Sequence, residues 1–187
     1  MLRAVDVEAV QLFTSLLALL AGAGAIGLAV ARLMARSSGG AAAVVAAVDD
    51  VALWLAFLVA AASTAGSLYF SEHAHFIPCT LCWYQRIAMY PLSLLLLIAA
   101  IRRDRGIRWY VGPLAGAGAL ISTYHYLVEW FPSLESEDVC SVSVPCTAPW
   151  FRELGFVTLS FMALCGFLFI LVLVVPRWPV ITPSEVQ

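Results

Sequence analysis

Long runs of apolar residues, separated by short polar segments, dominate this chain of 187 residues. A helix that crosses a bilayer needs roughly 20 predominantly apolar residues. Five stretches are of about this length and character, and they cover approximately residues 9–33, 51–70, 84–101, 109–131 and 154–175. The segments between them leave no room for a separate soluble domain. The pattern therefore predicts an all-α polytopic membrane helix bundle in a single membrane domain, residues 1–187.

Composition supports a membrane protein. Hydrophobic residues make up 63% of the chain and charged residues only 12%, whereas soluble domains carry about 25% charged residues. The formal net charge of −2 indicates neither nucleic acid nor an acidic partner.

The arginines orient the predicted bundle. Most of them lie after the first helix, between the third and fourth helices, or after the last one: Arg32, Arg36, Arg102, Arg103, Arg105, Arg108 and Arg177. Basic connectors face the cytoplasm. The N-terminus and the loops at 71–82 and 132–152 are therefore predicted outside the cytoplasm, with the C-terminus inside.

The first apolar stretch also allows a second interpretation, a cleaved signal peptide, because Ala29-Val30-Ala31 resembles a cleavage site. However, Asp6 and Glu8 are unusual in such a leader, and the apolar run is too long. We therefore expect a membrane helix, with a flexible turn at residues 37–40 and a short apolar lead-in at 41–48.

Three glycines in this helix, Gly22, Gly24 and Gly27, match the G-x-G-x-x-G pattern of dinucleotide-binding proteins. That motif needs a preceding strand, which the sequence does not predict. Close packing of small residues between membrane helices is the favoured explanation.

A Cys-x-x-Cys pair, Cys79 and Cys82, stands at the start of the third helix. A helix start favours the thiolate, the reactive form of cysteine. Thr80 is expected to cap the helix, and Arg86 to lie on the same face as Cys82. We expect a redox pair, the alternative being a static disulfide. The alternative for Arg86 is an interfacial arginine that reaches back to water.

A second pair, Cys140 and Cys146, lies in the other extracytoplasmic loop, where disulfides form and persist. The five-residue gap allows their disulfide to close. Two pairs on one side suggest a relay by thiol–disulfide exchange, although a locally stabilising disulfide is an alternative. The four cysteines are badly spaced for zinc, whose structural sites favour gaps of roughly two to four residues, so no metal is expected.

Such a relay must pass its electrons on. The sequence contains no haem attachment motif, no convincing nucleotide fold and no thioredoxin-like domain. A lipid-soluble carrier that reaches Cys82 from the bilayer is the simplest remaining acceptor. We expect Cys165 to be a small buried apolar residue, and His73 and His75 to be solvated loop residues. Glu129 is expected near the outer surface, without a special role.

Three blocks carry a family resemblance. They are residues 79–86 (Cys-Thr-Leu-Cys-Trp-Tyr-Gln-Arg), residues 124–126 (Tyr-His-Tyr), and the run from Cys140 through 144–147 (Val-Pro-Cys-Thr) to 155–158 (Gly-Phe-Val-Thr). With them the chain resembles the DsbB disulfide-bond-formation proteins, especially their short-loop BdbC branch, over roughly residues 51–175. The resemblance implies a four-helix core, to which this chain adds one N-terminal transmembrane helix.

The resemblance further implies a quinone-dependent thiol oxidase in the bacterial cell membrane. It would re-oxidise a DsbA-like thioredoxin-fold protein, with menaquinone or ubiquinone as acceptor, and so support the folding of secreted proteins. By position, Cys140 would meet the partner, Cys146 would exchange with Cys79, and Cys82 would face the quinone. The implied disulfides are Cys79–Cys82 and Cys140–Cys146, and Arg86 and His125 would bind the quinone.

Three alternatives remain. A vitamin-K-epoxide-reductase-like enzyme shares the chemistry, but its redox pair follows its loop cysteines, the reverse of the order here. A conduit that sends electrons outward needs reactive cysteines near both faces, and only Cys165 is available. A structural membrane protein with two static disulfides is the non-enzymatic alternative.

Overall fold

Five α-helices form a bundle in the computed structural model, which describes residues 2–135, 140 and 144–174. They are α1 (Leu2–Met34), α2 (Gly39–Leu68), α3 (Thr80–Arg102), α4 (Arg108–Trp130) and α5 (Leu159–Val174). Short helices span Tyr69–His73, Arg105–Ile107 and Pro132–Leu134. The described residues contain no strand beyond an isolated bridge between Glu153 and Val157. The all-α prediction is confirmed.

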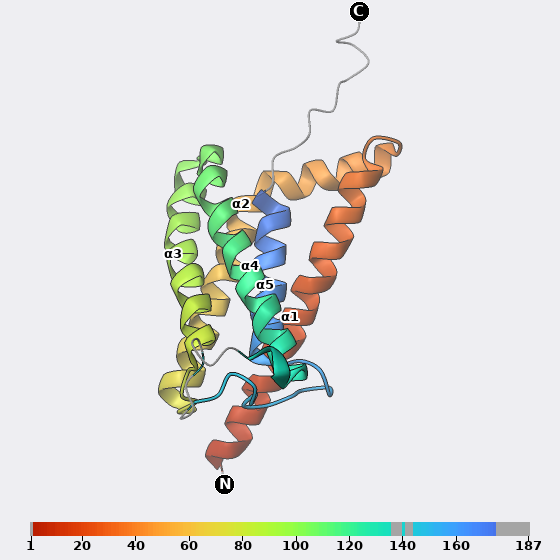
Figure 1. Ribbon diagram of the computed structural model, residues 1–187. Helices are drawn as coiled ribbons and strands as arrows, with labels where there is room; N and C mark the ends of the chain where they lie inside the picture. The colour runs from red at the N-terminus through yellow and green to blue at the C-terminus, as the bar shows by residue number, and fades with distance from the viewer. Residues whose placement is uncertain (1, 136–139, 141–143, 175–187) are drawn as a thin grey trace, which may run out of the picture.

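Helix α5 lies at the centre, packed against α1, α2 and α4, while α3 packs against α2 and α4 (Figure 1). The start of α1 and both cysteine-bearing loops share one end of the bundle. The α1–α2 turn and the α3–α4 connector share the other end (Figure 1). This arrangement brings the two cysteine loops together, although 57 residues, including most of α3 and all of α4, lie between Cys82 and Cys140 in the sequence.

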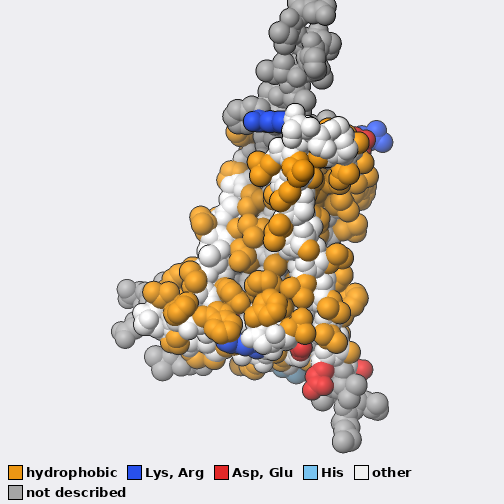
Figure 2. Space-filling view, turned by 90° about the vertical axis from the view of Figure 1, so that its right-hand side faces the viewer, with side chains coloured by type: hydrophobic (Ala, Val, Ile, Leu, Met, Phe, Trp, Pro, Cys, Tyr) orange, Lys and Arg blue, Asp and Glu red, His pale blue; other side chains and the backbone are white. Residues whose placement is uncertain are grey.

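The surface between the two ends is apolar. Large side chains such as Leu20 (69% exposed) and Leu120 (74% exposed) point outward, and charged side chains gather toward the ends (Figure 2). Three helical stretches are long and apolar enough to cross a bilayer: Asp6–Met34, Gly39–His73 and Thr80–Arg102. Exposing such an apolar surface to water costs free energy, whereas contact with the hydrocarbon of a bilayer does not. The protein is a multi-pass membrane protein.

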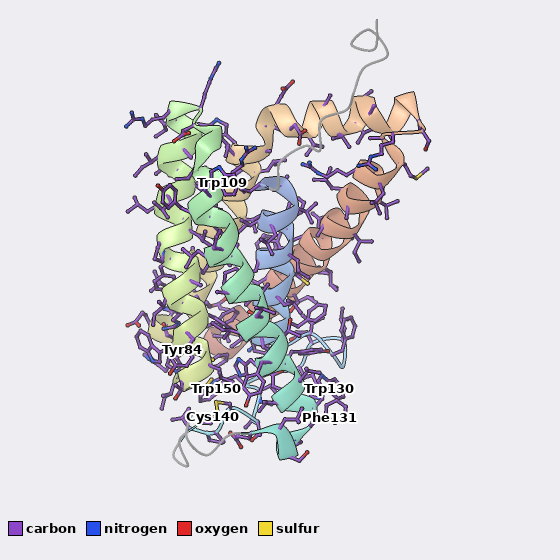
Figure 3. The ribbon with its side chains drawn as sticks, turned by 45° about the horizontal axis from the view of Figure 1, so that its top comes forward. Tyr84, Trp109, Trp130, Phe131, Cys140 and Trp150 are labelled. Atoms are coloured by element: carbon purple, nitrogen blue, oxygen red, sulfur yellow. A yellow bond between two sulfur atoms is a disulfide. The ribbon has the colours of Figure 1, made fainter. Side chains whose placement is uncertain are left out.

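Aromatic side chains mark the two ends of the apolar surface. Trp109 lies near the end with the α3–α4 connector, whereas Tyr84, Trp130 and Trp150 lie near the cysteine loops (Figure 3). All four are substantially exposed. Such rings favour the membrane–water interface.

The start of α2 differs from the prediction. Ser38 caps the helix, and its hydroxyl accepts a hydrogen bond from the Ala41 N–H at 3.4 Å. Because α2 begins at Gly39, the flexible turn is shorter than the expected residues 37–40. Residues 41–48 are helical because their alanines and valines continue the apolar run. Arg32 pairs with Asp49 at 2.7 Å, which holds this part of α2 across the end of the bundle (Figure 1).

The start of α5 also differs, because the helix begins at Leu159 rather than at 154. Leu154 (φ 52°) and Gly155 (φ 82°) adopt the left-handed conformation, which ends regular helix. Two backbone hydrogen bonds between Glu153 and Val157 close this turn at 2.8 and 2.9 Å. Thr158 then caps α5, accepting the Phe161 N–H at 3.4 Å. Residue 175, the expected end of the helix, lies outside the described residues.

Small residues let the helices approach closely. Gly22 of α1 lies against Cys165, and Gly24 lies against Phe169. These contacts agree with packing as the role of the G-x-G-x-x-G pattern. The tightest contact joins Gly118 of α4 to the fully buried ring of Phe167 in α5.

Gly118→Ala is expected to destabilise the protein by about 1–3 kcal/mol, because a Cβ there would overlap the Phe167 ring. Gly116→Ala is the matched control, since a Cβ at Gly116 meets nothing within 4 Å. Thermal unfolding in detergent measures both variants. Equal unfolding midpoints would contradict this account of the α4–α5 contact.

Candidate active site

The start of α3 positions the first thiol pair. Cys79 is the N-cap of the helix, and its sulfur accepts the backbone N–H of Cys82 at 3.3 Å. The expectation that Thr80 caps the helix is therefore wrong, because the Cys79 sulfur occupies that role. The two sulfur atoms lie 2.9 Å apart. Both cysteines are free thiols in the structure, and the disulfide between them stays a prediction.

The surroundings of Cys79 stabilise its thiolate. A hydrogen bond with the Cys82 thiol lowers the pKa of Cys79, and the nearby His125 ring and the Cys82 N–H lower it further. Burial opposes this shift, since Cys79 is only 6% exposed. The hydrogen bonds and the His125 ring together outweigh burial, so the pKa of Cys79 lies well below its ordinary value of 9.0.

The second pair is close to the first. Cys140 and Cys146 form a disulfide with a Cα–Cα distance of 5.9 Å. Both are buried in one apolar cluster with Cys79, Leu81 and Val128. A carboxylate oxygen of Glu135 accepts the N–H of Cys146 at 2.9 Å. Residues 136–139 and 141–143 of this loop lie outside the described residues.

Aromatic stacking holds the two loops against each other. The Trp150 ring stacks on Phe76 with centroids 4.8 Å apart, and Phe76 in turn stacks on Phe70. The indole N–H of Trp150 donates to the Ile77 carbonyl at 3.2 Å. As a result, both cysteine pairs contribute to one cavity of about 340 Å³, which Cys79, Cys82 and Cys146 line.

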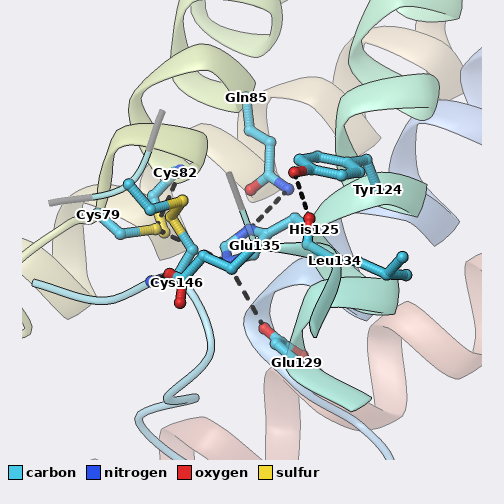
Figure 4. The surroundings of a disulfide bond; sticks show 10 residues. Cys79, Cys82, Gln85, Tyr124, His125, Glu129, Leu134, Glu135 and Cys146 are labelled. Carbon is cyan, nitrogen blue, oxygen red and sulfur yellow. Dashed lines mark hydrogen bonds and ion pairs between the residues drawn. A yellow bond between two sulfur atoms is a disulfide. The ribbon is translucent and has the colours of Figure 1, made fainter. Parts of the chain in front are cut away.

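A buried polar row on α4 reaches the thiols (Figure 4). The Nε2 atom of His125 lies 3.7 Å from the Cys79 sulfur and 3.8 Å from a Glu129 carboxylate oxygen. On its other side, the Nδ1 atom lies 3.3 Å from the side-chain amide of Gln85. One imidazole nitrogen thus faces both a thiol and a carboxylate, between which it can carry a proton.

Glu129 corrects a sequence expectation. It was expected to have no special role, but its buried carboxylate accepts the Thr158 hydroxyl at 2.7 Å. Thr158 in turn contacts Ser160 at 2.9 Å. The sequence does contain a signal for this contact. His125 and Glu129 are four residues apart, and residues with this spacing share one face of a helix.

Arg86 contacts a different neighbour. Its guanidinium donates to the Ser67 carbonyl of α2 at 3.1 Å and lies 5.3 Å from the Trp83 ring centroid. Arg86 thus turns toward α2, whereas His125 projects from α4. The two residues come from different helices, and their role in binding a quinone stays a prediction.

The remaining candidates lie apart from the site. Cys165 is buried in α5 against Gly22 of α1. His73 and His75 are exposed, and the His73 ring lies against Tyr69 with centroids 5.1 Å apart.

The reactivity of Cys79 tests the thiolate assignment. A lowered pKa keeps Cys79 deprotonated below pH 9, so its alkylation rate is expected to change little as the pH falls toward neutrality. An ordinary thiol loses about tenfold in rate per pH unit there. Cys82→Ala removes the largest stabilising donor and is expected to move the midpoint of the pH profile upward. Mass spectrometry of alkylated protein measures this, with His73→Ala as the control that leaves the midpoint in place. An unchanged midpoint in Cys82→Ala would refute the assignment.

Comparison with known proteins identifies relatives that share this site. The family model described as disulfide bond formation protein DsbB matches residues 49–176. Disulfide bond formation protein C of Bacillus subtilis (strain 168) is 45% identical over 122 residues, or 65% of this chain and 88% of that protein. The probable disulfide formation protein of Deinococcus radiodurans is 50% identical over 103 residues, or 54% of this chain and 67% of that protein. No solved structure matches the chain.

The matched region contains both cysteine pairs and all the helices that form the site, but it begins after α1 and after the first turns of α2. It thereby confirms the resemblance seen in the sequence. The chain belongs to the DsbB family of disulfide bond formation proteins.

Proposed function

We propose that this protein is a quinone-dependent thiol oxidase that re-oxidises a DsbA-like thioredoxin-fold protein. Family membership makes it a membrane oxidoreductase of disulfide-bond formation, and the acceptor and the partner are the proposed steps. The observation that carries the proposal is the placement of both cysteine pairs in one buried cluster and one cavity. Thiol–disulfide exchange requires such contact, because one sulfur must attack the other directly.

The first exchange takes electrons from the partner. A partner thiolate attacks Cys140, the Cys140–Cys146 bond breaks, and Cys146 leaves as a thiolate. The partner's second thiol then displaces Cys140. The partner gains a disulfide, and Cys140 and Cys146 together take up two electrons and two protons.

The second exchange takes place within the chain. The Cys146 thiolate attacks Cys79, the Cys79–Cys82 bond breaks, and Cys82 leaves. Cys140 then displaces Cys79, which restores the loop disulfide and leaves Cys79 and Cys82 reduced. His125 can move a proton to or from Cys79, because its Nε2 atom lies 3.7 Å from that sulfur.

The proposed acceptor is a quinone, either menaquinone or ubiquinone, which takes up two electrons and two protons. The residues beside Cys82 fit a planar, lipid-borne group. Trp83 is 52% exposed at the start of α3, and Arg86 places a fixed positive charge 5.3 Å from its ring. The flat ring is suited to stacking and the guanidinium to binding a carbonyl oxygen. His125, from α4, is the second residue proposed for this role.

The site is proposed to face the outside of the bacterial cell membrane. Both cysteine loops lie at the end opposite the arginine-rich connector (Figure 1), and basic connectors favour the cytoplasm.

A reporter that is active only outside the cytoplasm tests this orientation. Fused after Ser37 it is expected to be silent, and fused after Phe131 it is expected to be active. The opposite result would reverse the orientation.

Turnover of purified protein tests the chemistry. With a reduced thioredoxin-fold partner and added quinone, we expect partner-dependent loss of quinone absorbance. Cys82→Ala is expected to abolish it, because the thiol that passes electrons on is gone. Cys165→Ala is the control and retains turnover, since Cys165 lies apart from the site. Full turnover in Cys82→Ala would disprove the relay, and a thiol state indifferent to quinone would favour static disulfides.

A further inference from the structure

The first thiol pair and His125 bring together a set of metal-binding atoms. The two sulfur atoms and an imidazole nitrogen lie within 4.8 Å of one another, from the start of α3 and from α4. Two thiolates and an imidazole are ligands that Zn²⁺ and related soft divalent cations prefer. We propose that the reduced Cys79–Cys82 pair, with His125, is a binding site for a zinc-class cation, which blocks the pair when bound.

The distances are close to those of a tetrahedral site. With the usual Zn–S and Zn–N bond lengths, two sulfurs are separated by about 3.8 Å and a sulfur and a nitrogen by about 3.5 Å. The Cys79 sulfur and the His125 Nε2 atom lie 3.7 Å apart, which already fits. The sulfur–sulfur distance of 2.9 Å must widen by roughly 1 Å. Cys82 is half-buried and lines the cavity, so a rotation of its side chain supplies this change.

The surroundings support each ligand. The Cys82 N–H donates to the Cys79 sulfur at 3.3 Å, which stabilises a coordinated thiolate as it does a free one. The Gln85 side-chain amide lies 3.3 Å from Nδ1 of His125. Turned so that its oxygen faces the ring, this amide accepts the Nδ1–H and leaves Nε2 unprotonated to bind the cation. A partner on the second ring nitrogen is usual for a histidine that binds metal.

Glu129 lies beside the site but outside the group of Cys79, Cys82 and His125 ligand atoms that are within 4.8 Å of one another. One carboxylate oxygen lies 3.8 Å from His125 Nε2, and Thr158 holds the other at 2.7 Å. Two sulfurs and one nitrogen leave the fourth position of a tetrahedral site to a water molecule, which the Glu129 carboxylate is placed to hydrogen-bond. The expectation of no metal was based on the four loop cysteines, and this set differs because His125 comes from another helix.

Metal and disulfide exclude each other at this site. Binding converts the Cys82 thiol to a thiolate and releases its proton, whereas Cys79 is already a thiolate near neutral pH; no oxidation state changes. A Cys79–Cys82 disulfide has no thiolate to offer, so the cation selects the reduced protein and holds it there. The inhibition of turnover rests on the proposed function, whereas the binding itself does not.

Cd²⁺ is the probe, because its thiolate complexes absorb in the ultraviolet. The experiment uses the full chain in detergent with Cys140→Ser, Cys146→Ser and Cys165→Ala, so that Cys79 and Cys82 are the remaining thiols. After reduction we expect one Cd²⁺ per chain and release of the Cys82 thiol proton. Oxidised protein is expected to give no thiolate absorption.

Variants in this background identify the ligands. Cys82→Ser is expected to abolish the two-thiolate absorption. His125→Ala and the more conservative His125→Asn are each expected to weaken affinity at least tenfold, and His73→Ala to leave it unchanged. Circular dichroism verifies that each variant is folded.

Equal affinity in both folded His125 variants, or equal binding by oxidised protein, would overturn the proposal. Because the assay contains neither quinone nor partner, its outcome is independent of turnover. Failure to reduce quinone would refute the proposed function and leave the metal site standing. In the wild-type enzyme, Zn²⁺ is expected to stop turnover and a chelator to restore it.

Discussion

Buried polar side chains on α4 determine how the redox end of the bundle is assembled. In a membrane protein every buried polar group must find its partner within the protein. His125 finds partners in Cys79 and Gln85 of the α3 region, and Glu129 finds one in Thr158 at the start of α5. The same contacts therefore join three segments of the chain and place a proton-carrying ring against the redox sulfur.

The two cysteine pairs differ in their surroundings. Cys79 is held at a helix start, where N–H and S–H donors stabilise its thiolate. Stabilising the reduced form makes a disulfide a stronger oxidant. Cys140 and Cys146 lie in an irregular loop, held by aromatic stacking to the residues that precede α3. The proposed function requires electrons to move from loop to helix, and stabilisation of the Cys79 thiolate favours that direction.

Much of this architecture follows from the sequence, because apolar runs and a Cys-x-x-Cys motif are local features. The helices and the redox pair were predicted from them, while the roles of Arg86 and His125 came from the family resemblance. The errors occur where distant segments decide the outcome. Glu129 has an unremarkable place in the sequence, and its burial depends on how α5 packs beside α4. The start of α5 was missed because Leu154 adopts a left-handed conformation, which an apolar pattern does not reveal.

Helix α1 lies outside the region that matches the family, yet it contacts the helix that supports the site. Its small residues pack against α5 at Cys165 and Phe169. Nearer the redox end, the buried hydroxyl of Ser15 lies 3.6 Å from the Met162 sulfur. Met162 is in the first turn of α5, where its N–H donates to the carbonyl of Thr158. Because Thr158 is also the residue that binds Glu129, α1 packs against the same turn of α5 that holds this carboxylate in place.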